Sequence, residues 1–166
     1  VPGQQVSVRA AIQDATAPVG SGGSIYLPRG KYRLSLTGTG GIEQGDLDIV
    51  KSTTIIGTGG GETIIDAGGD AGILDRVFEV LGSGQTLTLD SLTVTGGRAP
   101  INQSTGEMHG GGIFVRNGAT LDLRNSAVVD NKTRNSTEAI GGGIFFAQTG
   151  GHFITNSVIA YNHSAF

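Results

Sequence analysis

Apolar and polar residues alternate along short stretches of the chain. Apolar residues two positions apart are Leu87 and Leu89, Leu92 and Val94, Leu121 and Leu123, and Ala127 and Val129. A period of two predicts β-strands with one buried face. Gly, Asn, Asp and Ser, which favour turns, separate these stretches. The pattern therefore predicts an all-β protein built from short strands.

This pattern recurs at a nearly constant interval. At an offset of 31 residues, Gly141–Phe146 repeats Gly110–Val115 and Asn156–Asn162 repeats Asn125–Asn131. A shift of 35 residues aligns an earlier copy, Phe78–Val80 and Asp90–Val94, with Ile113–Val115 and Asn125–Val129. A still earlier copy, Leu47–Ile49, precedes Phe78–Val80 by 31 residues. The unit thus recurs four times, with four residues of slack in one loop.

A unit of about 31 residues is too short for a four-stranded propeller blade of ~40–45 residues. The alternative is a solenoid in which each unit forms one rung of about three strands and equivalent strands stack in parallel. We therefore predict a single-stranded parallel β-helix, right-handed by the usual crossover preference.

Polar residues recur at the predicted turns. Asp90, Asn125 and Asn156 share one turn position, and Asn131 and Asn162 share another. Stacked amides can hydrogen-bond along the axis of a solenoid, and Asn tolerates the left-handed backbone of a sharp corner. We interpret these residues as a structural ladder rather than as a row of binding groups.

The N-terminal part has a different pattern. Apolar residues form one helical stripe between Ser7, a plausible N-cap, and Ala17. Residues 1–23 are therefore predicted to form a cap with a helix at about 7–17, and residues 24–166 the parallel β-helix. Strands are expected at 24–27 and 31–36. No cap is recognisable at the C-terminal end, which we predict to be uncapped.

Composition supports this architecture and excludes others. Glycine supplies 30 of the 166 residues and charged residues only 15%, which argues against a helical bundle. The chain has no cysteine, hence no disulfide or thiolate metal site. No apolar run approaches the ~18 residues of a membrane span. Because the net charge is −3 and the 11 basic residues are scattered, we expect no nucleic-acid partner.

An ordered series of short segments resembles the CSLREA-type N-terminal module of bacterial secreted proteins. The segments are Val6–Ile12, Ile25–Tyr32, Gly45–Ile49, Thr54–Gly57, Thr63–Asp66, Asp75–Val80 and Leu92–Gly97. The module's first cysteine is replaced by Val6. The two Gly-Gly-Gly-Ile units are similar to repeats of polymorphic outer-membrane autotransporter passengers. Both resemblances imply a right-handed parallel β-helix displayed outside the cell, and neither implies catalytic residues.

Because parallel β-helices can host polysaccharide lyases and hydrolases, we considered the acidic residues as catalytic groups. The candidates are Asp46, Asp48, Glu62, Asp66, Asp70, Asp75 and Glu79, with Lys51 and Arg76 as candidate lyase bases. Asp46 and Asp48 share a strand face, expected to be the outer one because Leu47 and Ile49 look buried. The residues stacked on Asp48 are expected to be Glu79, Phe114 and Phe145. This column favours a face that is solvated at the two acidic residues and makes apolar contacts at the two phenylalanines. No catalytic residue is therefore assigned.

Metal and ice binding are not favoured either. His109, His152 and His163 do not recur at the 31-residue interval, and we interpret them as solvated turn residues. The loop from Asp66 to Asp70 falls short of a calcium-binding set. A threonine array beginning at Thr93 and Thr95 continues with Val128 and Asp130, then Ile159 and Tyr161, and so ends after one rung. No metal, catalytic or cofactor-binding residue is assigned, and no cofactor is expected.

The glycosylation pattern Asn-x-Ser/Thr occurs at Asn102, Asn131, Asn135 and Asn162. Glycans would place these residues on loops outside a cell. The alternative explanation, turns rich in Asn, Ser and Thr, is favoured.

These observations predict an extracellular or cell-surface structural or adhesive β-helix module that self-associates through its C-terminal end. The alternative is a carbohydrate-active enzyme, either a polysaccharide lyase or a glycoside hydrolase, or a fragment of one. The expected partners are other copies of the protein or the remainder of a longer chain, with a surface polysaccharide or a host receptor as further candidates.

Overall fold

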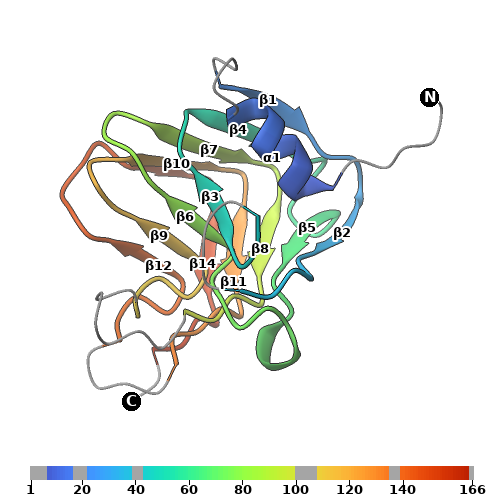
Figure 1. Cartoon of the computed structure of the whole chain (residues 1–166), viewed down its shortest axis with the longest axis vertical. Coiled ribbons are helices and arrows are strands. Elements are labelled where there is room, and N and C mark those ends of the chain that lie inside the picture. The colour runs from blue at the N-terminus through green and yellow to red at the C-terminus, as the bar shows by residue number, and fades with distance from the viewer. Residues whose placement is uncertain (1–6, 17–21, 39–42, 100–107, 135–138, 165–166) are drawn as a thin grey trace.

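The computed structural model describes residues 7–16, 22–38, 43–99, 108–134 and 139–164. Three parallel β-sheets wind around one apolar core (Figure 1), as the repeat predicted. Each complete turn of the chain contributes one strand to each sheet, so the fold is a parallel β-solenoid. The right-handed winding stays a prediction.

The strands of the three sheets are as follows. Sheet A contains β1 (Gly23–Tyr26), β4 (Thr53–Ile56), β7 (Thr86–Asp90), β10 (Thr120–Arg124) and β13 (Phe153–Thr155). Sheet B contains β2 (Gly30–Arg33), β5 (Thr63–Asp66), β8 (Thr93–Thr95), β11 (Ala127–Val129) and β14 (Val158–Ala160). Sheet C contains β3 (Leu47–Ile49), β6 (Phe78–Val80), β9 (Ile113–Val115) and β12 (Ile144–Phe146).

Among the described residues, four three-stranded rungs follow a partial rung made of β1 and β2, and every pairing between these rungs is parallel. The offset of 31 residues is confirmed between the last two rungs in all three sheets. The 35-residue shift holds for Phe78 and Ile113, but sheets A and B shift by 34, with Leu87 beside Leu121 and Thr93 beside Ala127.

The physical reason for this one-residue error is a shorter loop: five residues separate β6 from β7, and four separate β9 from β10. Because side chains alternate between faces, a slip of one residue exchanges the faces. The expectation for β11 was therefore wrong: Val128 is fully buried, and Ala127 and Val129 are half-buried. The threonine array still ends, since Thr93 is followed by Ala127 and Val158.

The core consists of inward-facing residues from successive rungs. Ile113, Val115, Leu121 and Leu123 are almost completely buried, which confirms the buried face predicted for Leu121 and Leu123. Ile154 stacks on Leu123 but is 45% exposed. Its strand belongs to the last of the described rungs, so a neighbouring rung covers it on one side only.

Helix α1 (Val8–Thr16) covers the opposite end and contacts β1, β3 and β4. Figure 1 shows the helix beside β1, with β3, β6, β9 and β12 following in order away from it. Ser7 is the N-cap, since the Ala10 amide donates to its Oγ at 3.1 Å. Val8 and Ile12 are buried in the core. None of the described residues forms a helix that meets the length and apolar character of a membrane span.

Left-handed residues form the sharp corners. Ser91, Asn125 and Asn156 occupy one corner with φ of 59°, 48° and 49°. Asp90 precedes this corner by one residue, because it pairs with Arg124 in the strand register. Its carboxylate still joins the ladder: Asn125 Nδ2 donates to Asp90 Oδ1 at 3.0 Å, and Asn156 Nδ2 donates to Asn125 Oδ1 at 2.7 Å.

Candidate functional sites

Four acidic side chains meet on the outer face of sheet C. These residues, Asp46, Asp48, Asp75 and Glu79, are called the carboxylate cluster below. Ligand oxygens of Asp46, Asp48 and Glu79 all lie within 4.8 Å of one another. Strands β3 and β6 bring Asp48 and Glu79 together because the two residues are register partners. The other acidic candidates lie elsewhere and form separate ion pairs: Glu62 with Arg29, Asp66 with Lys31 and Asp70 with Lys132.

The cluster is not the solvated face that the sequence suggested. All four carboxylate residues are at most 9% exposed. Arg76 pairs with two of them, since its Nη1 lies 2.9 Å from Glu79 Oε2 and 3.4 Å from Asp46 Oδ2. Arg116 Nε lies 2.5 Å from Glu79 Oε1. The alternation of residues in β3 therefore marks two buried faces, one apolar and one ionic.

Arg9 ties the cap to this cluster. Its guanidinium donates to the backbone oxygens of Asp46 at 2.7 Å and Gly45 at 2.5 Å. Arg9 comes from α1 and is itself 7% exposed. A residue of the capping helix thus fixes the backbone that presents Asp46.

Burial and mutual repulsion dominate the electrostatics of the cluster, which contains four carboxylates and three neighbouring arginines. Desolvation raises the pKa of Asp48 to about 6, with a further contribution from Glu79. Burial, together with the charge of Asp75, raises the pKa of Asp46 well above its ordinary value. Burial also raises the pKa of Asp75. The cluster therefore retains a proton more readily than exposed carboxylates do.

A cation would have to compete with Arg76 for this cluster. The guanidinium group already lies between Asp46 and Glu79, where a metal ion bound by these carboxylates would lie. Arg76, named above as a candidate base, is the centre of the ion-pair network. Lys51 lies in the segment between β3 and β4 and is half-buried.

Aromatic side chains continue the same face of sheet C. The predicted column of Asp48, Glu79, Phe114 and Phe145 is confirmed by the register. Phe114 and Phe145 have ring centroids 5.6 Å apart, and the guanidinium groups of Arg76 and Arg116 lie 5.1 and 5.5 Å from the Phe114 centroid. Cation–π contacts therefore connect the ionic and aromatic halves of the face.

The last rung, formed by β12, β13 and β14, exposes a group of large apolar side chains. These are Phe153 (61%), Ile154 (45%), Val158 (57%) and Ile159 (45%). Ile154 and Ile159 stack on the fully buried Leu123 and Val128, so they continue the core into an open cross-section. This surface has the composition of a protein interior rather than of a solvated face.

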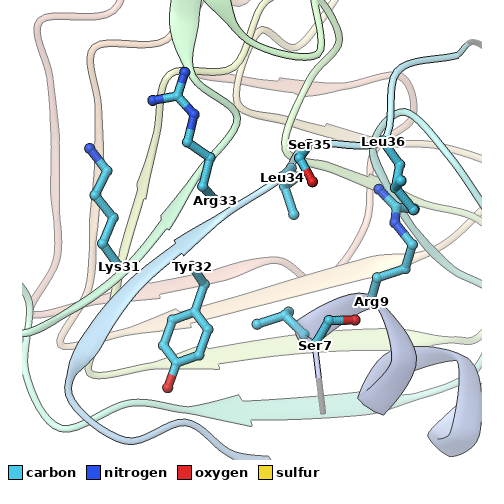
Figure 2. Close-up of a pocket in the computed structure, with 9 residues that line it drawn as sticks. Ser7, Arg9, Lys31, Tyr32, Arg33, Leu34, Ser35 and Leu36 are labelled. Carbon is cyan, nitrogen blue, oxygen red and sulfur yellow. The ribbon is translucent and has the colours of Figure 1, made fainter. Parts of the chain in front are cut away.

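A hollow of about 430 Å³ lies between the start of α1 and β2, where residues of the helix face Tyr32, Leu34 and Leu36 (Figure 2). Lys31 and Arg33 project to the side of β2 opposite Tyr32 (Figure 2) and lie 2.8 and 3.7 Å from Asp66. Lys31 and Arg33 are thus already paired with a carboxylate. The hollow is the boundary between the capping helix and the first strands.

The second asparagine ladder, Asn131 and Asn162, is buried at Asn131 and half-buried at Asn162. Asn131 is fully inaccessible; its Oδ1 accepts from the Gly97 amide at 2.9 Å, and its Nδ2 donates to the oxygens of Val94, Val129 and Asn162. A glycan attaches to that same nitrogen, so glycosylation of Asn131 is incompatible with this fold. Asn162 is half-buried, and its Nδ2 donates to the Val128 oxygen at 2.8 Å. Asn102 and Asn135 lie outside the described residues.

The three histidines lie apart from one another, and the interpretation of them as solvated turn residues is wrong for His109 and His152, which are half-buried. His109 packs against Phe145 with ring centroids 4.4 Å apart. His152 stacks on Phe146 at 4.0 Å, and its Nδ1 accepts from the Leu121 amide. His163 is exposed. Among the described residues, no grouping of potential metal ligands contains a histidine.

Comparison of the chain with models of protein families, with curated proteins and with solved structures found no match. The arguments about function therefore rest on the geometry above. All four acidic residues of the cluster were named from the sequence, but Arg76 was named only as a candidate base, and Arg9 and Arg116 were not named. A signal was present, because Arg76 lies three residues before Glu79 and one after Asp75.

Proposed function

We propose that this chain is an extracellular or cell-surface structural module, adhesive in character, that self-associates through its last rung. The observation that carries the proposal is the apolar exposure of the last rung: Ile154 and Ile159 continue the core into an open cross-section, and Phe153 and Val158 are exposed beside them. The resemblance to CSLREA-type modules supports the extracellular location.

Backbone edges strengthen the argument from apolar exposure. In the described structure, β12, β13 and β14 each pair with one neighbouring strand, so each presents a second edge. An unpaired edge beside apolar side chains is a template for further strands. A second rung placed there would satisfy backbone groups of three sheets and cover Ile154 and Ile159, which continue the core.

A second copy fits this surface better through its own last rung than through its helix-covered end. Helix α1 covers the opposite end of the solenoid, so a head-to-tail filament would require the helix to leave β1, β3 and β4. Contact between two last rungs requires no such movement and closes with two-fold symmetry. The expected assembly is therefore a tail-to-tail dimer.

Sedimentation equilibrium over a wide range of protein concentration tests the dimer. Ile154→Lys and Ile159→Lys place charges in the cross-section and should shift the equilibrium to monomer by at least tenfold. Tyr26→Lys is the matched control, since Tyr26 is 73% exposed on β1, at the end covered by α1. Circular dichroism verifies that each variant is folded. A wild-type chain that is strictly monomeric at high concentration contradicts the dimer.

Probing of intact native cells with antibody tests the location. Detection only after the cells are opened contradicts an extracellular module.

The enzyme alternative has one observation in its favour, the raised pKa of Asp48 beside other carboxylates, which is typical of acid–base sites. Against it, the four carboxylates are buried, and arginine side chains already pair with Asp46 and Glu79. Release of reducing or unsaturated ends from a polysaccharide panel, abolished by Asp48→Asn, would establish the enzyme instead.

A further inference from the structure

A hollow of about 260 Å³ lies at the corner of the solenoid that follows sheet B. Its charged and aromatic lining consists of Asp70, Arg98, Asp130, Lys132, Tyr161 and His163, and we call it the corner pocket. It is smaller than the ~300–1,000 Å³ of pockets for drug-sized ligands, so a single ring is the largest group that it can hold. Its residues come from four successive turns of the chain.

Three basic residues form a column along this pocket. Isolated parallel bridges join Arg98 to Lys132 and Lys132 to His163. Neighbouring strands of a sheet are ~4.8 Å apart, so the side chains repeat at about that interval. The Lys132 amide donates to the Gly97 oxygen at 2.9 Å, and the Thr133 amide donates to the His163 oxygen at 3.0 Å, which fixes this register.

The column is only weakly neutralised. Asp70 pairs with Arg98 and lies 3.1 Å from Lys132 Nζ, but its own side chain is 72% exposed. The pair of Asp70 with Lys132 is of the exposed kind that contributes about 0–1 kcal/mol, so an external anion can replace Asp70 at Lys132. Arg98 is 13% exposed, and its buried Nε has no hydrogen-bond acceptor in the part of the chain that the structure describes.

Tyr161 is an unusual residue for its position. It occupies a left-handed corner with φ of 57°, where Gly96 and Asp130 occupy the same corner in the two preceding rungs. A left-handed backbone costs an ordinary residue roughly 1–2 kcal/mol. Tyr161 as a whole is 77% exposed, so packing does not compensate this cost. A strained aromatic residue at the rim of a charged hollow points to ligand binding.

We propose that the corner pocket binds one acidic sugar residue of a saccharide. The sugar's carboxylate lies against Arg98 and Lys132, and its apolar ring face packs on Tyr161. Asp130, exposed in the same pocket, accepts hydrogen bonds from the sugar hydroxyls. The site lies along the side of the solenoid, and its chemistry requires neither self-association nor the carboxylate cluster.

Titration calorimetry with trigalacturonate as the probe tests the proposal, with uncharged galactotriose and inorganic sulfate as comparison ligands. Trigalacturonate should bind, and the neutral sugar should bind at least tenfold more weakly. Lys132→Gln should weaken binding about fivefold. Asp70→Asn should strengthen it about threefold, because it removes the competing carboxylate.

Tyr161→Asn separates binding from stability. Asn accepts the left-handed corner more easily than Tyr, so the variant should be at least as stable as the wild type but bind at least tenfold more weakly. No binding of trigalacturonate at millimolar concentration overturns the proposal. Equal binding of galactotriose, or sulfate binding of the same strength with no effect of Tyr161→Asn, also overturns it. Sedimentation of the same samples reports separately on the dimer.

Discussion

Ile113→Ala and Ile144→Ala form a matched pair that measures how much a rung gains from having neighbours on both sides. The two isoleucines are register partners in β9 and β12, and both face the core. Ile113 lies between Phe78 and Ile144 and is fully buried. Ile144 stacks on Ile113 and is half-buried in the last rung.

The substitution removes three carbon atoms, each worth about 0.8 kcal/mol when fully buried. At Ile113 the residues above and below are held by the strand ladders and cannot collapse into the cavity, which adds to the loss. We therefore expect Ile113→Ala to lower the free energy of unfolding by about 3–4 kcal/mol. At Ile144 only one neighbouring rung is present in the described structure, and we expect about 1–2 kcal/mol.

Urea denaturation followed by far-ultraviolet circular dichroism measures both losses. The experiment uses protein concentrations at which the chain is monomeric, because a dimer would cover Ile144. Equal losses for the two variants, or a loss below 1 kcal/mol at Ile113, would refute the argument that stacking on both sides determines the stability of a rung.

Three further predictions concern polar groups. In the folded protein the pKa of Asp48 is raised from 3.8 to about 6. The contribution of protonated Asp48 to the free energy of unfolding is therefore complete below pH 3.8 and is lost as the pH rises through about 6. Asp48→Asn should therefore gain stability relative to wild type, on the order of 1–2 kcal/mol, between pH 4 and 7 in thermal melts. Asn131→Ala should cost about 2–4 kcal/mol in urea because it leaves buried partners unsatisfied, whereas the exposed Asn156→Ala should cost less than about 1 kcal/mol. Arg76→Ala should cost about 3–5 kcal/mol, since it leaves buried carboxylates uncompensated, whereas Arg124→Ala should change the midpoint of urea unfolding little.

The repeat made the solenoid predictable from the sequence. Two matches at 31 residues and the alternation of apolar residues fix which strands stack, and the stack of Asp48, Glu79, Phe114 and Phe145 follows directly. Loop lengths were less predictable. One residue fewer between β9 and β10 moved Ala127 beside Thr93, and the alternation of residues alone does not reveal such a slip.

The carboxylate cluster was predictable in its acids but not in its burial. Alternation in β3 distinguishes two faces, but it does not say what covers the outer one. The outer face is covered in part by Arg76 and Arg116, which lie next to β6 and β9. Arg9 of the cap contacts the backbone of Asp46, more than 30 residues away in sequence. The corner pocket was missed for the same reason, since its residues stand on four successive turns.

The position of α1 makes the solenoid behave as a one-dimensional lattice with one boundary held by the helix, whereas the last of the described rungs, β12–β14, has a neighbouring rung on one side only. Each rung is stabilised mainly by its nearest neighbours, and the helix contacts β1, β3 and β4 at one boundary. Thermal openings in the monomer should therefore begin at β12–β14 and travel toward the helix. Amide hydrogen exchange would then decrease from rung to rung along the axis, fastest in β14 and slowest near β4 and β7. A partner that binds the last rung would slow exchange in strands it never touches.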